Sequence, residues 1–549
     1  MNEDQYALMS STTVSSGRSE WVNFNWKAIQ HRVKFLRYRI FSATRKKDSP
    51  NTIRLQGLML NSSANILLAI RQVTSNNRYK SFSGIEKIRV HLVQELMNIN
   101  LSSYSPIVYK SLNIPKTSRK QKLLKIEILK DLCIQLIVKN ALEPEWEARF
   151  EENIYGFRPG RCSHDAIAHS VQIMRTYNAK QWVVTVHLEQ TVTNFNVELI
   201  LRKLYSFPRI DLIFKWLKAG CVNLNNHFQL DFGSAIESII GSLLLDITFD
   251  DFDKIIKNHY SSITSRHFYI RHTSNILLFS ETQEEAINNR SLFALWCENM
   301  GISYTLDSVQ ISYLKDGFNF LGIQVCPKKY SNYSIALVPN ENAQKEIRAK
   351  LKNIWMRGRG KDVQWVLEKL NPRIREWCSY YSFYKSSKIF KDIDNWMFQR
   401  SVRYCKRTHP NKSWTWMQKK YFGRFNAKKN SRWIFGDKET GKYLIRFSWT
   451  TVRQYVPIQI QASPDNVIYK SYWIKRNATG ITNNQLWNIS DFKIAQRQNN
   501  ICPICESSLY NQEPIEKHKI IIKKSATQIY PFNMMFLHSM CYECLKNTY

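Results

Sequence analysis

The residues best suited to chemistry stand near the C-terminus, as two Cys-x-x-Cys pairs about 35 residues apart. The pairs are Cys502 with Cys505, and Cys541 with Cys544. Four thiolates at this spacing suit a tetrahedral structural zinc ion. The other seven cysteines are scattered singly, as in proteins with reduced thiols, which disfavours a disulfide framework. The sequence therefore predicts a zinc module over residues 501–549.

A second stretch with chemical potential is the polar segment from His272 to Asn275. Apolar residues precede it at Phe268 and Ile270 and follow it from Ile276 to Phe279. Such a pattern predicts a buried β-hairpin whose turn presents polar side chains at the edge of a sheet. On these residues alone, an ordinary hairpin turn fits as well as a functional site.

Charge points to the class of partner. The 549 residues include 79 Lys and Arg against 44 Asp and Glu, a net charge of +35. An excess of this size favours a polyanion, with nucleic acid ahead of a membrane surface. No run of about 18 apolar residues is present, so no membrane span is expected. Residues 345–453 hold 28 Lys and Arg against 8 Asp and Glu, a net +20, so the main interface is expected there.

Basic residues in two regions are candidates for phosphate contacts. For Arg158, an internal salt bridge is the alternative, and Trp377 and Tyr381, at helical spacing, suit a core better than base stacking. Pro372 is expected to start the helix that carries them. The candidates are Lys116, Arg119, Lys120, Arg158 and Arg161, and then Arg373, Arg375, Lys406, Arg407, His409, Lys412, Lys419 and Lys420.

Several motifs carry a resemblance to a known family. The run LEPEWEARFEENIYGFRPGRCSHDAI, residues 142–167, is similar to the fingers of group II intron-encoded reverse transcriptases and maturases. The segment from Asn371 to Tyr381 and the Lys406 to Lys412 turn resemble the maturase domain of the same family. The resemblance implies an α+β multidomain protein with right-hand polymerase fingers and palm, an α-helical thumb/maturase domain and a small zinc-bound HNH-like module. The expected divisions are 1–20 disordered, 21–175 N-terminal extension and fingers, 176–335 degenerate palm, 336–455 thumb/maturase, 456–500 connector and 501–549 HNH-like module.

The resemblance also shows where chemistry has been lost. His187, Ser274 and Asn275 stand where relatives carry the metal-binding aspartates, although Glu189 leaves a displaced carboxylate open. Two magnesium ions need several hard anionic ligands, so polymerisation is not expected. Lys519 replaces the histidine base of HNH endonucleases, and a protonated lysine is a poor base. His518, Asn533 and His538 remain as weak metal-binding candidates in that module.

The implied function is that of a maturase. Such a protein binds group II intron RNA and promotes splicing by stabilising the active RNA fold, with magnesium supplied only through the RNA. Weak binding of the intron DNA target stays open, and the oligomeric state is unknown. The alternatives are an active reverse transcriptase and endonuclease for intron mobility, or a general organellar RNA-binding splicing factor. An acidic N-terminus without a targeting pattern, together with AT-rich residue usage, favours an organelle-encoded protein, in a chloroplast before a mitochondrion.

Overall fold

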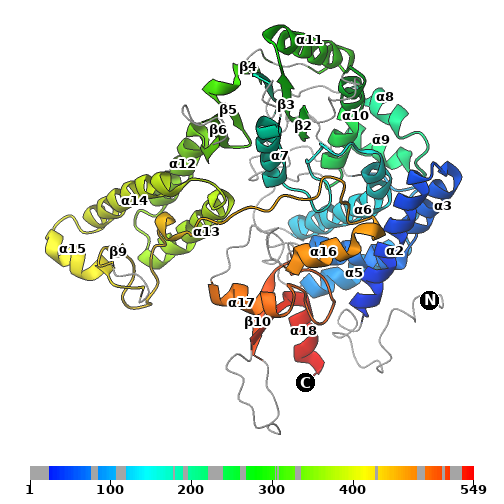
Figure 1. Cartoon of the computed structure of the whole chain (residues 1–549). Coiled ribbons are helices and arrows are strands. Elements are labelled where there is room, and N and C mark those ends of the chain that lie inside the picture. The colour runs from blue at the N-terminus through cyan, green and yellow to red at the C-terminus, as the bar shows by residue number, and fades with distance from the viewer. Residues whose placement is uncertain are drawn as a thin grey trace.

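The computed structural model contains both helices and sheets. Its chain passes from a first packed region to a second one and later returns to the first (Figure 1). Two apolar cores are present. One joins the N-terminal helices, one face of the central sheet and the last 50 residues, and the other joins the opposite sheet face to the later helices. The structure describes residues 24–75, 85–106, 119–176, 180–188, 196–219, 239–259, 268–302, 305, 308–327, 335–426, 431–478, 489–509, 513–519 and 534–548.

The first packed region is a helical layer built around one long helix, α6. Trp26, Ile29, Val33 and Ile40 recur at helical spacing and are buried on one face of α2, as predicted for an amphipathic helix. Side-chain caps from Asn25 and Asp48 begin α2 and α3. The helices are α2 (Trp26–Arg45), α3 (Ser49–Leu60), α4 (Ser63–Thr74), α5 (Ile85–Met97) and α6 (Arg119–Arg149).

A four-stranded antiparallel sheet follows, in the order β2-β3-β1-β4. All six residues of β3 are buried, because helices cover both faces of the sheet. The strands are β1 (Trp182–His187), β2 (Tyr269–His272), β3 (Asn275–Ser280) and β4 (Val309–Tyr313). The accompanying helices are α7 (Ser163–Thr176), α8 (Val197–Lys203), α9 (Ile210–Ala219), α10 (Gly241–His259) and α11 (Gln283–Asn299).

A small sheet leads into a second helical region, at the left of Figure 1. Pro372 was expected to start a helix, but it lies inside α13, whose start is capped by the Asp362 side chain ten residues before it. The elements are β5 (Phe318–Phe320), β6 (Ile323–Pro327), β7 (Ile335–Pro339), α12 (Glu341–Arg357), α13 (Val363–Tyr381), α14 (Ser387–Thr408), α15 (Trp414–Tyr421), β8 (Phe422–Gly423) and β9 (Ile434–Phe435).

An extended segment then returns to the first region, crossing Figure 1 in orange. It is pinned at Asp165, which accepts hydrogen bonds from the Tyr455 hydroxyl at 2.7 Å and from the Ile458 N–H at 2.8 Å. The chain ends in α16 (Lys470–Ala478), α17 (Ile489–Arg497), the hairpin β10 (Ile515–Lys519) and β11 (Met534–His538), and α18 (Ser539–Thr548). Among the described helices, none combines the length and apolar character needed to cross a membrane.

Candidate functional site

The structure gathers the three substituted positions of the sheet at one hairpin. His187 ends β1 directly opposite Asn275, the first residue of β3. The His187 Nδ1 and Asn275 Oδ1 atoms lie 2.7 Å apart, and Ser274 stands in the turn beside them. Ser274 and Asn275 are buried. An imidazole, a hydroxyl and an amide carry no negative charge, so these three side chains do not form the anionic cage that paired magnesium ions require. Glu189 lies outside the described residues.

The turn is supported from behind by a buried ionic cluster. Arg271, on β2, is fully buried and pairs with Asp246 at 2.6 Å and Asp253 at 2.8 Å, both on α10. Tyr269 donates to the same Asp253 carboxylate. Burial raises the pKa of Asp246 to about 6, although the Arg271 charge acts to lower it. Both carboxylates are thus engaged by Arg271, and they hold the hairpin against α10.

The loop after α6 completes this scaffold. Tyr155 donates its N–H to the Arg271 carbonyl at 2.8 Å, and Arg271 donates its own N–H to the Asn153 carbonyl at 3.2 Å. Gly156 then crosses the turn so closely that an added Cβ would collide with the Thr273 backbone. Thr273 itself has a φ of 55°, which few non-glycine residues adopt. The loop after α6 therefore holds the hairpin turn tightly, and the turn from His272 to Asn275 carries no acidic side chain.

Arg158 and Arg161 do not fit the predicted role of phosphate contacts. Both are buried. Arg158 makes a two-pronged ion pair with Glu147, at 2.9 and 3.1 Å, and also donates to backbone carbonyls. Arg161 donates to the carbonyls of Glu152 and Ile460. A guanidinium fork suits a carboxylate as well as a phosphate, and here it is used inside the protein. We therefore leave both residues out of the candidate interface.

The predicted phosphate-contacting residues that are exposed lie on the second helical region. Lys406 and Arg407 end α14 and are exposed, and within the described part of the chain no carboxylate pairs with either. On the same helix the pKa of Arg400 is lowered, first by burial and then by repulsion from Arg403 and Arg407. Cations that repel one another without acidic partners are typical of a polyanion-binding surface. Arg373 and Arg375 are also exposed, although Arg373 pairs with Glu376 at 3.0 Å.

A second group of cations surrounds Trp416 on α15. The Lys412 and Lys420 ammonium groups lie 5.6 and 5.1 Å from the centre of its indole ring. His409 bonds the Tyr421 hydroxyl at 2.6 Å, and its pKa is lowered by burial and by those two lysines. Lys419 is exposed beside them. His409 therefore favours its neutral form and acts mainly as a brace for the turn.

Two further groups of predicted residues have different outcomes. Tyr381 is buried, and Trp377 packs against it at 4.3 Å and against Phe390 at 5.7 Å, so these aromatic rings belong to the core. Lys116 lies outside the described residues. Arg119 and Lys120 begin α6, but their side chains are likewise outside the description. Contacts of these three with phosphate stay predictions.

Three of the four predicted C-terminal cysteines converge in the structure, and the fourth member of the described cluster is His538. The ligand atoms of Cys502, Cys505, His538 and Cys541 are all buried and lie within 4.8 Å of one another. The Cys505 Sγ and His538 Nδ1 atoms are 3.3 Å apart, close to the about 3.6 Å that two ligands of a tetrahedral zinc would have. The His538 Nε2 atom bonds the Ser508 carbonyl at 3.2 Å, which fixes the ring. The cluster could therefore hold a metal ion. The Cys544 side chain lies outside the described residues.

A buried arginine from the other end of the chain contacts this cluster. Arg71, on α4, lies 3.7 Å from Cys505 Sγ and 3.5 Å from Cys541 Sγ, and pairs with Glu513 at 2.8 Å. It is fully buried under the Trp26 ring. Nothing in the local sequence around Arg71 distinguishes it, so the sequence could not predict this contact. The C-terminal module is docked on the N-terminal helices rather than held apart.

The other expectations for the module find little support. His518 packs its ring against Tyr542 at 5.3 Å and is not part of the metal cluster. Lys519 ends β10, but its side chain lies outside the described residues. Asn533 lies wholly outside them.

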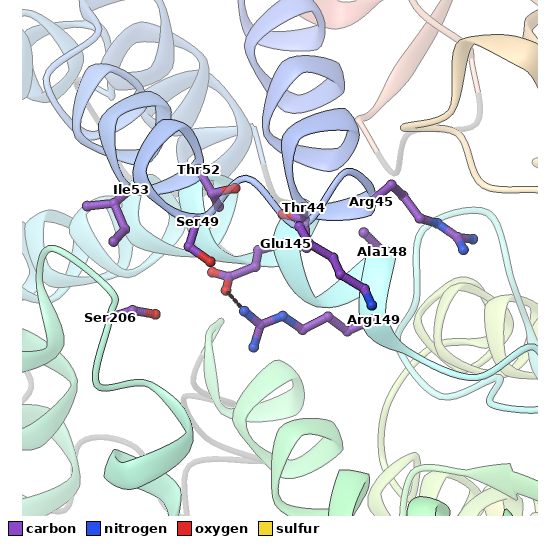
Figure 2. A pocket seen from close by; sticks show the side chains of 10 residues that line it. Thr44, Arg45, Ser49, Thr52, Ile53, Glu145, Ala148, Arg149 and Ser206 are labelled. Atoms are coloured by element: carbon purple, nitrogen blue, oxygen red, sulfur yellow. Dashed lines mark ion pairs between the residues drawn. The ribbon is translucent and has the colours of Figure 1, made fainter.

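A hollow in the N-terminal helices is lined by cations and hydroxyl groups. Its volume is about 380 Å³. Figure 2 shows Arg149 reaching the Glu145 carboxylate, an ion pair of 2.5 Å, beneath Ser49 and Thr52. Arg149 thus neutralises the Glu145 charge, and Gln56 donates a further hydrogen bond to the same carboxylate. The lining is Thr44, Arg45, Lys47, Ser49, Thr52, Ile53, Glu145, Ala148, Arg149 and Ser206.

Comparisons with known proteins find three successive matches along the chain. Residues 21–101 match the N-terminal domain of reverse transcriptase, residues 114–325 match reverse transcriptase (RNA-dependent DNA polymerase), and residues 344–422 match the group II intron, maturase-specific domain. These three matches follow one another in the order expected from the sequence.

Similar individual proteins occur in bacteria and in Euglena. Protein YkfC of Escherichia coli (strain K12) is 23% identical over 344 residues, 53% of this chain and 90% of the relative. Maturase-like protein 1 of Euglena gracilis is 24% identical over 447 residues, 79% of this chain and 89% of the relative. Group II intron-encoded protein LtrA of Lactococcus lactis subsp. cremoris is 29% identical over 176 residues, 31% of this chain and 28% of the relative.

Proposed function

Because the chain belongs to the family of group II intron-encoded reverse transcriptases and maturases, we propose that it works as a maturase without polymerase activity. It binds group II intron RNA and favours the splicing-active fold, and the RNA performs the transesterification with its own magnesium. A protein cofactor of this kind needs only to bind the active fold better than the alternatives.

One observation carries the proposal. His187, Ser274 and Asn275 meet at the hairpin turn without a carboxylate, while Lys406 and Arg407 at the end of α14 are exposed and form no ion pair with a carboxylate among the described residues. The two aspartates behind the turn pair with Arg271 and are not free to bind magnesium. The chain thus combines a preserved scaffold with an accessible basic surface, which supports RNA binding rather than nucleotide addition.

The proposed RNA interface consists of exposed residues of the second helical region. These would neutralise backbone phosphates, so affinity would fall steeply with salt. The cation-lined hollow of Figure 2 offers a secondary contact on the N-terminal helices. The primary set is Arg373, Arg375, Lys406, Arg407, Lys412, Lys419 and Lys420.

For the C-terminal module we propose a structural zinc ion held by Cys502, Cys505, His538 and Cys541. Three thiolates and an imidazole are ligands that zinc prefers, and bound zinc would fix the turn, hairpin and helix of the module together. The hairpin and following helix favour descent from an HNH endonuclease, and Lys519 in place of the base favours loss of cleavage. Docking of the module on Arg71 supports a stabilising role.

For location we propose an organelle, with the chloroplast ahead of the mitochondrion. The AT-rich residue usage and the similarity to a maturase-like protein of Euglena gracilis support this proposal.

The test is splicing of the intron that hosts or neighbours the reading frame, at near-physiological magnesium, with and without purified protein. Lys406→Glu/Arg407→Glu is expected to abolish the stimulation. Lys87→Glu/Lys493→Glu is the matched control, because it makes the same charge change at exposed lysines outside the proposed interface. Primer extension is measured on the same preparation and is expected to stay at background.

Each contrary result has a definite meaning. Extension above background would overturn the proposed loss of polymerase activity. Absence of any protein-dependent splicing, with RNA binding intact, would favour a general RNA-binding factor. Equal loss in the two charge-reversal variants would show that the effect comes from net charge and not from the α14 surface.

A further inference from the structure

The second helical region contains a hollow apart from its lysine-rich surface. It lies between α14, α15 and β9, which stand together at the far left of Figure 1, and its volume is about 430 Å³. That volume is large enough for the ring of a nucleobase. The lining is Asp394, Asn395, Met397, Phe398, Ser401, Trp414, Trp433, Ile434, Phe435, Leu444, Ile445 and Arg446.

Aromatic rings provide the large apolar faces that stay accessible in this lining. Trp414 and Trp433 are nearly parallel, with an interplanar angle of 6° and ring centres 6.5 Å apart. Phe398 meets Trp433 edge-on at 6.2 Å. Trp433 keeps 42% of its surface exposed and Phe398 keeps 36%. Large aromatic faces left exposed in a concave site mark a binding surface, and flat rings suit flat ligands.

Polar groups on the rim fix the site. Arg446 donates to the Trp433 carbonyl at 2.7 Å and so holds the indole in place. Asp394 accepts the N–H groups of Phe447 and Ser448 at 2.8 and 3.0 Å, which commits both of its oxygens. The exposed Asn395 amide has no hydrogen-bond partner among the described residues. It offers both a donor and an acceptor at the mouth of the hollow.

We propose that this aromatic hollow, rather than only the lysine-rich surface, receives an unpaired nucleobase of the bound RNA. The base stacks on Trp433, with the Asn395 amide at its edge. Arg432, next to Trp433 in the sequence, and Arg446, which lines the hollow, would meet the attached phosphate. The +20 charge of the surrounding residues 345–453 favours RNA over an apolar peptide or a second basic copy of the chain. The inference rests on the proposed function, because it takes intron RNA as the ligand.

Stacking and phosphate contacts leave different signatures, and the test uses that difference. Stacking contributes about 1–3 kcal/mol per base, which corresponds to about 5- to 150-fold in affinity, and it releases no counterions. Loss of a phosphate contact reduces the slope of log K against log salt by about 0.7 for a single strand. A stacking variant should therefore weaken binding at every salt concentration without changing the slope.

The experiment measures binding of a single-stranded RNA 12-mer and of a 12-base-pair RNA duplex to the full chain at several salt concentrations. Trp433→Leu removes the aromatic face, and Trp433→Phe keeps one in a side chain of similar bulk. Phe214→Leu is the control, because Phe214 is 44% exposed on α9, away from the hollow. Thermal melting of each variant shows that it is folded.

Trp433→Leu is expected to lose about 5- to 150-fold in affinity for the single strand with an unchanged slope and unchanged duplex binding. Trp433→Phe should recover most of that loss, and Phe214→Leu should bind like the parent protein. Unchanged affinity in Trp433→Leu, equal losses for strand and duplex, or no recovery in Trp433→Phe would each overturn the inference. The proposed function fails separately, if the parent protein binds no RNA or does not stimulate splicing.

Discussion

Replacement of Arg71 by methionine tests whether the C-terminal module is fastened to the N-terminal helices through its metal cluster. The substitution keeps an unbranched apolar stem in a fully buried position but removes the guanidinium. Glu513 would then be left buried without its 2.8 Å partner, and the Cys505 and Cys541 sulfurs would lose the cation at 3.7 and 3.5 Å. If zinc is bound, three thiolates against a dication would leave one negative charge, which Arg71 would compensate.

The expected cost is large. Breaking one side of a buried ion pair costs about 3–5 kcal/mol. Methionine also loses the cation–π contact with Trp26, an additional contribution of roughly 1 kcal/mol. The control is Lys27→Gln, because Lys27 joins the same two regions through Glu506 at 2.7 Å but both side chains are about half exposed. An exposed pair contributes about 0–1 kcal/mol.

The first assay measures the rate at which zinc passes from the protein to a chromophoric chelator at 25 °C. The second assay measures the rate at which a protease cleaves the module. If release requires undocking, the two losses of about 4–6 kcal/mol in Arg71→Met should accelerate it by about 1000- to 25,000-fold. Lys27→Gln should accelerate it by less than about fivefold. In Arg71→Met/Glu513→Gln part of the loss should return, since the buried negative charge that Arg71 neutralises is removed as well. Equal release rates in the two single variants would refute the argument that the module is fastened through Arg71.

Other predictions concern the scaffold. Arg158→Gln should lower the free energy of unfolding by about 3–5 kcal/mol, because Glu147 would be left buried without its ion pair to Arg158, and the RNA affinity of the folded fraction should not change. A stable variant with weakened RNA binding would show that Arg158 belongs to the interface. Gly156→Ala should lower the melting temperature by several degrees, because the added Cβ meets the Thr273 backbone. The control Gly57→Ala, in the interior of α3 with open space around it, should stabilise the protein by about 0.5–1 kcal/mol. Similar shifts in the two variants would contradict the close approach of the loop to the turn. The pKa of Asp246 is raised to about 6, above that of an unfolded chain, so its contribution to stability is complete below about pH 4 and is lost as pH rises through 6. Unfolding measured between pH 4 and 7 should show this slope in the parent protein and lack it in Asp246→Asn, and equal slopes would show that Asp246 is already ionised.

The sequence predicted features that depend on local pattern. The apolar runs of β1 and β3 and the polar turn between β2 and β3 follow from alternation and burial, and the family resemblance is confirmed. Three of the four predicted cysteines converge in the described structure because short Cys-x-x-Cys spacing constrains them locally.

Features that depend on distant partners could not be predicted. A guanidinium suits carboxylate and phosphate alike, so only the placement of Glu147 shows why Arg158 is internal. Pro372 resembled a helix start, but Asp362 supplies an earlier cap. The contact of Arg71 with the cysteines requires parts of the chain more than 400 residues apart to meet.

The meeting of the two chain ends also has a consequence for biosynthesis. Ser507 bonds Gln30, Glu506 pairs with Lys27, and Glu513 pairs with Arg71, so each contact waits for a residue that is made more than 400 positions later. During translation the N-terminal helices emerge first and must remain incompletely packed, with Arg71 uncovered, until the C-terminal module leaves the ribosome. A product of premature termination before Cys502 would keep this defect permanently and expose it to proteases. Synthesis through the C-terminal module is thus a condition for a fully stable protein.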